Sequence, residues 1–179
     1  MRLLFPSRFR IGFLTAALCC VVTQGCMEPR VRYTRDEQGG VHMFVPGNWD
    51  YRTNYRVPQA RLKKIADSYL GTRYKNGGTS RKGVDCSGFV FLVFQELIGA
   101  AVPRSSGKLW KLGTTVSGPE ARSGDLVFFR GGFFNGINHV GIYMGNKTFI
   151  HASATGGVMY DGLDEAYYKK RFAGIRRIF

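Results

Sequence analysis

One cysteine and two histidines carry side chains that could together cleave an amide bond. Cys86 stands at the start of an apolar stretch that is predicted to be helical, and His139 and His151 fall in two neighbouring stretches predicted to be strands. A thiolate attacks a carbonyl best when a base removes the thiol proton and later delivers it to the leaving amine. We expect His139 to be that base, and His151 to hold the His139 ring in the useful tautomer.

The helix that would position the thiol is apolar nearly all round. Apolar residues recur at helical spacing over 89–98, so we expect this helix to be buried. Asp85 and Ser87 are capping-type residues, and Gly83 interrupts the chain just before them. The helix should therefore begin at or beside Cys86, where backbone N–H groups and the helix dipole favour thiolate over thiol. The alternative is that Cys86 only fills the core, as free cysteines often do.

The register of the two predicted strands decides whether the imidazoles meet. Alternation places His139 and Gly141 on one face of the sheet. If His139 pairs opposite His151, or is offset from it by two residues, both rings share that face. A two-residue turn at Gly145 and Asn146 would instead put the rings on opposite faces. We predict the shared face.

Residues 1–25 predict an export signal. Three arginines precede an apolar run that is too short to span a bilayer comfortably. The run ends in Gly25 and Cys26, which resembles the processing site of a bacterial lipoprotein. We expect Cys26 to become an amino terminus carrying fatty acyl chains such as palmitate, which would hold the protein on a membrane outside the cytoplasm. The alternative is plain secretion without a lipid.

The cysteine count then singles out Cys86. Of the four cysteines, Cys19 and Cys20 would leave with the signal and Cys26 would carry the lipid. An exported chain with one unpaired thiol has no disulfide scaffold to explain that thiol, which favours a reactive group. A disulfide between Cys26 and Cys86 is the alternative, and it would silence the chemistry.

The charge balance indicates anionic partners. The chain has 26 Lys and Arg against 12 Asp and Glu, a formal net charge of +14. Export and the lack of a basic helix with interleaved aromatics argue against nucleic acid. Cell-wall carboxylates and anionic lipid head groups fit better, although a single cluster such as 169–171 is expected to be a solvated face. We expect the protein to act as a monomer.

We predict one domain at 58–179, which follows a linker or arm at 26–57. Its helices and strands must position Cys86, His139 and His151. A helix over 59–70 precedes the Cys86 helix, and 102–108 is predicted to be a loop. Helices first and strands second indicate an α+β domain with an antiparallel sheet. The predicted strands, rich in β-branched and aromatic residues, are 125–130, 139–144, 148–152, 157–160 and 172–179.

Four motifs, in order along the chain, resemble those of the NlpC-type cell-wall cysteine peptidases, a papain-like family. The resemblance covers about 58–179 and implies an α+β papain-like core in which the nucleophile helix packs on an antiparallel sheet. It implies Cys86 as nucleophile, His139 as base and His151 as the third polar residue, with no cofactor. It also implies hydrolysis of peptidoglycan stem peptides, between D-glutamate and a diamino acid. The motifs are Asp85-Cys86-Ser87-Gly88-Phe89-Val90, Ser123-Gly124-Asp125-Leu126-Val127-Phe128-Phe129, His139-Val140-Gly141-Ile142-Tyr143 and Phe149-Ile150-His151-Ala152-Ser153.

The resemblance implies further site residues around the thiol. Tyr74 matches a tyrosine of the family whose hydroxyl lies close to the sulfur. We expect Asp85 to cap the helix, and as a second role to accept the free amine of a stem peptide. Ser87, Arg104 and Ser105 are expected to contact substrate.

Three other functions stay open on the sequence. A zinc site formed by Cys86, His139 and His151 is disfavoured because no two of these ligands are close in sequence. A lipid acyltransferase of related fold would use the same three groups. A non-catalytic wall-binding lipoprotein would result if the arm covered Cys86. The aromatic insert at 131–136 is interpreted either as a gate over the cleft or as an ordinary loop.

Overall fold

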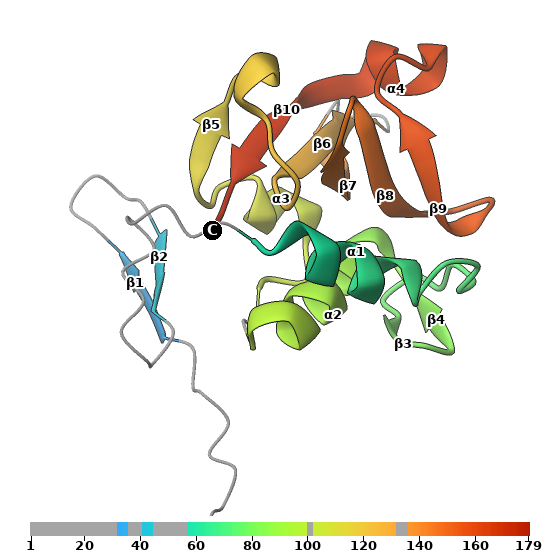
Figure 1. Ribbon diagram of the computed structural model, residues 1–179, viewed down its shortest axis with the longest axis horizontal. Helices are drawn as coiled ribbons and strands as arrows, with labels where there is room; N and C mark the ends of the chain where they lie inside the picture. Colours follow the sequence, from blue (N-terminus) through green and yellow to red (C-terminus); the bar gives the residue numbers. More distant parts are fainter. Residues whose placement is uncertain (1–31, 36–40, 45–56, 100–101, 132–135) are drawn as a thin grey trace, which may run out of the picture.

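The computed structural model describes residues 32–35, 41–44, 57–99, 102–131 and 136–179. The expected signal, Cys26 and most of the arm and of the insert at 131–136 lie outside this range. The described chain forms a six-stranded antiparallel sheet with two longer helices and one short helix packed toward one face and a second short helix on the other, which confirms the predicted α+β class (Figure 1). None of the described helices is long and apolar enough to cross a membrane.

The large sheet has the strand order β5-β10-β6-β7-β8-β9. Its strands are β5 (Thr114–Val116), β6 (Leu126–Arg130), β7 (Ile137–Gly145), β8 (Thr148–Ser153), β9 (Gly157–Gly162) and β10 (Phe172–Arg177). Two small hairpins pair β1 (Arg32–Arg35) with β2 (Val41–Phe44) and β3 (Thr79–Ser80) with β4 (Gly83–Val84). The helices are α1 (Gln59–Asp67), α2 (Cys86–Ile98), α3 (Ser106–Leu109) and α4 (Ala166–Arg171), with a 3-10 turn η1 (Gly118–Glu120).

The sequence predicts the long elements better than the short ones. All five predicted strands are present as β6 to β10, with ends displaced by a few residues. The predicted loop at 102–108 instead runs into α3, whose first turn is capped by the Ser105 hydroxyl. The first helix ends at Asp67, three residues before the predicted end. Strand β5 and helix α4 have no sequence prediction, because each is too short to show a periodic pattern.

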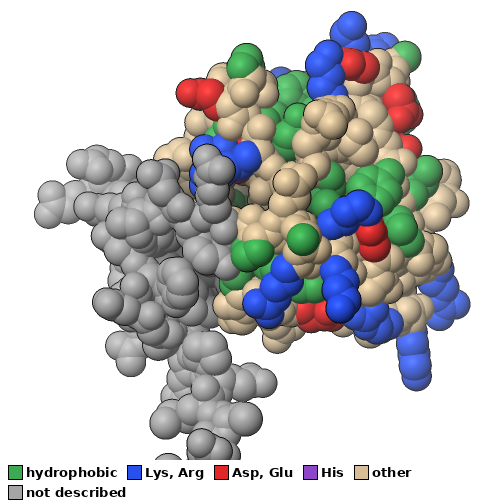
Figure 2. All heavy atoms as spheres, in the orientation of Figure 1, with side chains coloured by type: hydrophobic (Ala, Val, Ile, Leu, Met, Phe, Trp, Pro, Cys, Tyr) green, Lys and Arg blue, Asp and Glu red, His purple; other side chains and the backbone are tan. Residues whose placement is uncertain are grey.

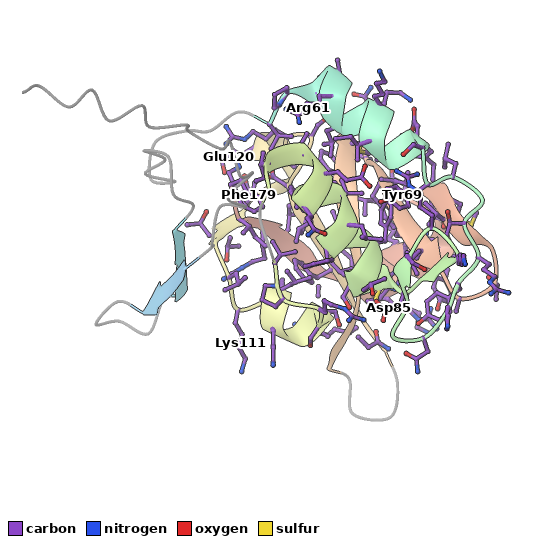
Figure 3. The ribbon with its side chains drawn as sticks, turned by 90° about the horizontal axis from the view of Figure 1, so that it is seen from below. Arg61, Tyr69, Asp85, Lys111, Glu120 and Phe179 are labelled. Atoms are coloured by element: carbon purple, nitrogen blue, oxygen red, sulfur yellow. The ribbon has the colours of Figure 1, made fainter. Side chains whose placement is uncertain are left out.

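Helix α2 begins where predicted, because Asp85 caps it. Oδ1 of Asp85 accepts a hydrogen bond from the backbone N–H of Gly88 at 2.6 Å. The other end stops at Gly99, whose φ of 69° is the left-handed conformation that favours glycine. Figure 3 shows Asp85 at the start of α2, in the helical layer that covers the sheet.

Each face of the sheet carries its own apolar cluster. The first cluster lies under α1 and α2 and includes Phe89 and Phe94 of α2 and Phe128 of β6. The second lies on the opposite face, where Tyr168 of α4 packs with Phe129 of β6. Cys86 belongs to the first cluster, whereas the imidazole of His139 stacks against Phe129 of the second, with 5.9 Å between ring centroids. The thiol and its predicted base therefore approach from opposite faces of the sheet.

The turn between β7 and β8 would by itself separate the two histidines. Asn146 and Lys147 have φ angles of 49° and 60° and form a two-residue turn that pairs Gly145 with Thr148. Continued without interruption, that pairing would alternate the strands so that the two imidazoles pointed to opposite faces.

An extra residue in β7 reverses this outcome. Tyr143 pairs with Phe149, so Met144 is left over between this pair and the turn as a β-bulge. The shifted register places Gly141 opposite His151, which is two residues from His139. Both imidazoles then share one face, and the two-residue offset that the sequence allowed is confirmed.

Replacing Gly141 with Ala tests the close approach of β8 to β7. A Cβ there would lie 2.6 Å from Cδ2 of Phe149 and 3.1 Å from Cβ of His151, both in the packed interior. We expect the free energy of unfolding, measured in urea, to fall by about 1–3 kcal/mol. The matched control is Gly118→Ala, where nothing lies within 4 Å of the added carbon. Equal stability of the two variants would contradict the proposed packing.

Candidate active site

The sulfur of Cys86 sits at the first residue of α2, beside strand β7. Cys86 is a free cysteine and 8% exposed, so it is buried but reachable. The backbone N–H groups of Val140, Ser87 and Cys86 itself act on the sulfur as hydrogen-bond donors. Val140 directly follows His139, so the thiol lies next to the strand segment that carries the predicted base.

The ladder between β7 and β8 ends before it reaches the two histidines. Pairing between β7 and β8 runs from the turn only as far as Ile142 and Ile150. Strand β7 continues to pair with β6 as far as Ile137, and β8 continues to pair with β9 as far as Ser153. Beyond Ile142 the N–H of Val140 acts on the Cys86 sulfur and lowers the pKa of the thiol. The sulfur therefore lies beside the segment of β7 that carries His139.

The two imidazoles form a hydrogen-bonded pair. Nε2 of His139 lies 2.8 Å from Nδ1 of His151, and the rings are perpendicular. Burial, and then the neighbouring His151, lower the pKa of His139 to about 3, although Asp161 acts in the opposite sense. Burial also lowers the pKa of His151, against the opposing effect of Asp161. Both rings are neutral at neutral pH, so His139 is free to accept a proton.

Two residues beyond the predicted set extend this pair. Nε2 of His151 lies 2.8 Å from Oδ2 of Asp161 on β9, and the Tyr168 hydroxyl donates to the same oxygen at 2.6 Å. The predicted strand ended at residue 160, one position short of Asp161. Met159 pairs opposite His151, and Asp161 is two residues further along the same strand. A predicted strand that included residue 161 would therefore have placed its carboxylate on the face that carries His151. Tyr168 gave no such signal, because only the fold brings α4 to the sheet.

The protonation state of Cys86 differs from the prediction. Burial raises the pKa of the thiol, and the backbone N–H groups that lower it do not compensate. The N–H groups at the helix start do favour the thiolate as expected, but desolvation of the buried sulfur outweighs them. The resting pair is a neutral thiol and a neutral imidazole, and the proton must move when the sulfur attacks.

Tyr74 precedes the nucleophile helix, and the charge of Cys86 acts on its hydroxyl. It bridges to Val84 just before α2. Burial raises the pKa of its hydroxyl, and the charges of Cys86 and Asp85 raise it further, which places the hydroxyl within electrostatic range of both. The hydroxyl therefore stays protonated and can donate a hydrogen bond beside the thiol.

The remaining predicted residues form a network that supports the loop before α2. Oδ2 of Asp85 accepts from the N–H of Gly77 at 2.8 Å, and the exposed Arg104 donates to the carbonyl of Gly77 at 2.5 Å. The buried hydroxyl of Ser87 donates to Oδ1 of Asp85 at 3.0 Å. Ser105 caps α3 through its hydroxyl. Asp85 thus ties the Gly77 loop to the start of the nucleophile helix.

Known proteins resemble this chain in sequence and in fold. The NlpC/P60 family model matches residues 71–177. The murein DD-endopeptidase MepS/murein LD-carboxypeptidase of Escherichia coli K12 is 45% identical over 168 residues, which are 94% of this chain and 88% of that protein. This chain belongs to the NlpC/P60 family.

Two further relatives of the family differ in how much they share. The gamma-DL-glutamyl hydrolase of Bacillus subtilis is 42% identical over 113 residues, which are 63% of this chain and 27% of that protein. The crystal structure of an NlpC/P60 family protein from Bacillus cereus superposes with a TM-score of 0.63 and 27% identity. That match covers 83% of this chain and 50% of the other, so the likeness extends over half of the longer protein. The papain-like core expected from the sequence is confirmed.

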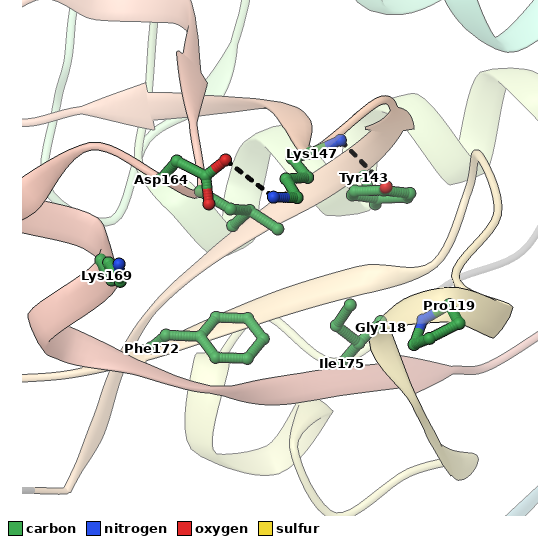
Figure 4. Close-up of a pocket in the computed structure, with 9 residues that line it drawn as sticks. Gly118, Pro119, Tyr143, Lys147, Asp164, Lys169, Phe172 and Ile175 are labelled. Carbon is green, nitrogen blue, oxygen red and sulfur yellow. Dashed lines mark hydrogen bonds and ion pairs between the residues drawn. The ribbon is translucent and has the colours of Figure 1, made fainter.

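This NlpC/P60 domain has a hollow beside strands β7 and β10 (Figure 4). It has a volume of about 470 Å³ and is lined by Tyr143, Phe172 and Ile175 among others. Its charged groups include Lys147 and Asp164, which form an ion pair at 3.0 Å. Neither the sulfur nor an imidazole lines it. Among the described residues, no group of three or more His, Cys, Asp or Glu could hold a metal ion.

The lowered pKa of His139 predicts acid sensitivity. Its ordinary value is 6.5 and its folded value about 3, so the unfolded chain binds the proton first as the pH falls. Stability is therefore lost progressively below about pH 6.5. We expect His139→Gln to lose less free energy of unfolding than the wild type between about pH 7.5 and about pH 5, a window above most carboxylate titration. Denaturant unfolding at both pH values measures this, and identical losses would contradict the buried neutral imidazole.

Proposed function

We propose that this protein is a cysteine peptidase that hydrolyses peptide-stem amide bonds of bacterial peptidoglycan. The observation that carries the proposal is the free thiol of Cys86 beside the backbone of Val140, on the strand in which the preceding residue, His139, pairs with His151, in a family member. The relative with the broad match is named a murein endopeptidase, and murein is the same polymer. The roles of nucleophile, base and orienting residue follow from this arrangement.

The proposed reaction has two halves, and His139 passes one proton in each. His139 takes the Cys86 proton as the sulfur attacks the carbonyl carbon, and the tetrahedral oxyanion accepts hydrogen bonds from nearby donors such as the Tyr74 hydroxyl. The imidazolium then protonates the leaving amine while the C–N bond breaks and a thioester remains. In the second half His139 deprotonates a water that attacks the thioester carbon, the C–S bond breaks, and the imidazolium returns the proton to the sulfur, which restores the thiol and leaves a carboxylic acid. No cofactor is needed for these steps.

The scissile bond has two candidates. The sequence resemblance implies the bond between D-glutamate and the diamino acid, and the Bacillus subtilis relative is named for a glutamyl bond. The Escherichia coli relative, which matches more of this chain, is named for a DD bond and an LD-carboxypeptidase activity. Mass spectrometry of fragments from defined muropeptides, one cross-linked and one with a free stem, distinguishes the two. The same experiment with phospholipid in place of muropeptide tests the acyltransferase alternative.

The proposed substrate contacts lie around the start of α2. Asp85, Ser87, Arg104 and Ser105 line the segments next to the thiol, and we propose that they contact the stem peptide. The carboxylate of Asp85 has about four lone-pair positions and uses three of them within the protein. One position is left to accept the free amine of a stem peptide.

The proposed location is a membrane facing the cell wall. Cys26 would carry the lipid, and the domain would act outside the cytoplasm. Lys and Arg side chains outnumber Asp and Glu on the face drawn in Figure 2, and the whole chain has a net charge of +14. Such a surface attracts wall carboxylates and anionic head groups. The proposal includes a monomeric enzyme with no nucleic-acid partner.

Single substitutions at the three reacting groups test the mechanism. Cys86→Ala should abolish turnover of muropeptides, and His139→Ala should come close to doing so. His151→Ala should have a milder effect, because an orienting group contributes less than the base that it orients. The measurement is kcat/KM, with circular dichroism to show that each variant is folded. A wild-type rate in His139→Ala would rule out the proposed base.

Asp85→Asn tests the proposed amine contact. The Asn side chain can still accept from Gly88, whereas its amide group faces the Gly77 N–H and loses that bond, at a cost of about 0.5–1.5 kcal/mol. We expect KM to rise for stem peptides with a free amine and to stay unchanged for the same peptides after N-acetylation. An equal change for both substrates would reduce Asp85 to a helix cap.

A further inference from the structure

We propose that Asp161, held by Tyr168, is a positioning residue that fixes which nitrogen of His139 carries the proton. This inference rests on the proposed function, since it concerns the same base. It adds two residues, on β9 and α4, to a mechanism that otherwise ends at His151. The carrying observation is an unbroken row of hydrogen bonds from His139 through His151 to Asp161.

The direction of each hydrogen bond in this row follows from the groups around Asp161, which can only accept a hydrogen from His151. The Tyr168 hydroxyl donates its one hydrogen to Oδ2 of Asp161 at 2.6 Å. Its oxygen lies 3.2 Å from Nε2 of His151 and can only accept there. An ionised carboxylate also only accepts. Both neighbours of this nitrogen are therefore acceptors, and Nε2 of His151 must carry the hydrogen.

The tautomer of His151 in turn fixes the tautomer of His139. A neutral imidazole has one donor and one acceptor nitrogen, so Nδ1 of His151 is an acceptor. Its partner 2.8 Å away, Nε2 of His139, must then donate. Nδ1 of His139 is left with its lone pair and is the nitrogen that can take the thiol proton. The opposite set of tautomers would place a hydrogen on Nδ1 of His139 and disable the base.

The surroundings hold Asp161 in place for this role. Strand pairing sets Asp161 opposite Phe149, and the ring of Phe149 packs against His151 with centroids 4.9 Å apart. Tyr168 is 9% exposed and its ring also packs edge-on against Phe149. The side chain of Asp161 is 13% exposed, which limits competition from water for its oxygens. The carboxylate therefore has one stable orientation toward His151.

The negative charge has a second consequence during turnover. When His139 accepts the thiol proton it becomes an imidazolium in a buried site, which desolvation disfavours. Asp161 acts on both imidazoles in the direction that favours their charged forms. Its removal should therefore lower kcat rather than substrate affinity, because the charge develops only during the reaction.

The experiment compares two pairs of matched variants of the full-length protein. Asp161→Ala removes the acceptor, and Asp164→Ala removes an exposed carboxylate of the following loop that pairs with Lys147. Tyr168→Phe removes the hydroxyl that holds Asp161, and Tyr167→Phe removes the neighbouring hydroxyl of a side chain that is 59% exposed. Each protein is measured for kcat and KM on muropeptides, for its unfolding midpoint, and for imidazole tautomers by two-bond proton–nitrogen NMR.

We expect both histidines of the wild type to be Nε2–H tautomers. Asp161→Ala should lower kcat by roughly 10- to 100-fold with little change in KM, and should shift the His151 and His139 resonances toward the Nδ1–H form. Tyr168→Phe should do the same to a smaller extent, and Asp164→Ala and Tyr167→Phe should match the wild type. If Asp161→Ala does not fold, Tyr168→Phe against Tyr167→Phe decides.

Two outcomes separate the failure of this inference from that of the proposed function. Unchanged tautomers and kcat in Asp161→Ala, with Cys86→Ala inactive, would overturn the positioning role and leave the peptidase intact. Full activity in Cys86→Ala would overturn the peptidase, and the tautomers would still report whether Asp161 orders the row. A wild type with Nδ1–H on His139 would overturn the inference directly.

Discussion

The hydrogen bond between His139 and His151 depends on one extra residue in a strand. The two-residue turn that joins β7 to β8 would place these imidazoles on opposite faces of the sheet. The bulge at Met144 changes the pairing by one position and brings both rings to the same face. The site thus depends on backbone geometry near a turn, several residues from either ring.

The thiol and this pair meet β7 from different sides. Cys86 packs with the helices on one face, and His139 packs with the aromatic cluster on the other. The pairing of β7 with β8 ends at Ile142 and Ile150, whereas β7 stays paired with β6 as far as Ile137. In that segment the N–H of Val140 acts on the sulfur and lowers the pKa of the thiol. The nucleophile is therefore set against the residue that follows its proposed base.

Burial sets the protonation states of the whole site. Desolvation raises the pKa of the Cys86 thiol and lowers the pKa values of both imidazoles, so each group favours its neutral form. Charge is created only as the sulfur attacks. The groups that compensate it are the backbone donors around Cys86 on one side and the carboxylate of Asp161 on the other. Because the groups are neutral at rest and become charged in the transition state, these donors and this carboxylate stabilise the transition state more than the resting state.

The sequence alone determined the features that local chemistry encodes. Asp85 as a cap, Gly99 as a stop and the apolar run between them specify the nucleophile helix, and the alternation of β6 to β10 specifies the sheet. From the sequence, the two imidazoles could share a face only if His139 paired directly opposite His151 or was offset from it by two residues. The structure has the offset register. Only the tertiary structure decided that register, because a bulge leaves no sequence pattern of its own. It also decided the protonation state of Cys86 and the places of Asp161 and Tyr168, since burial and contacts between distant segments arise only when the chain is folded.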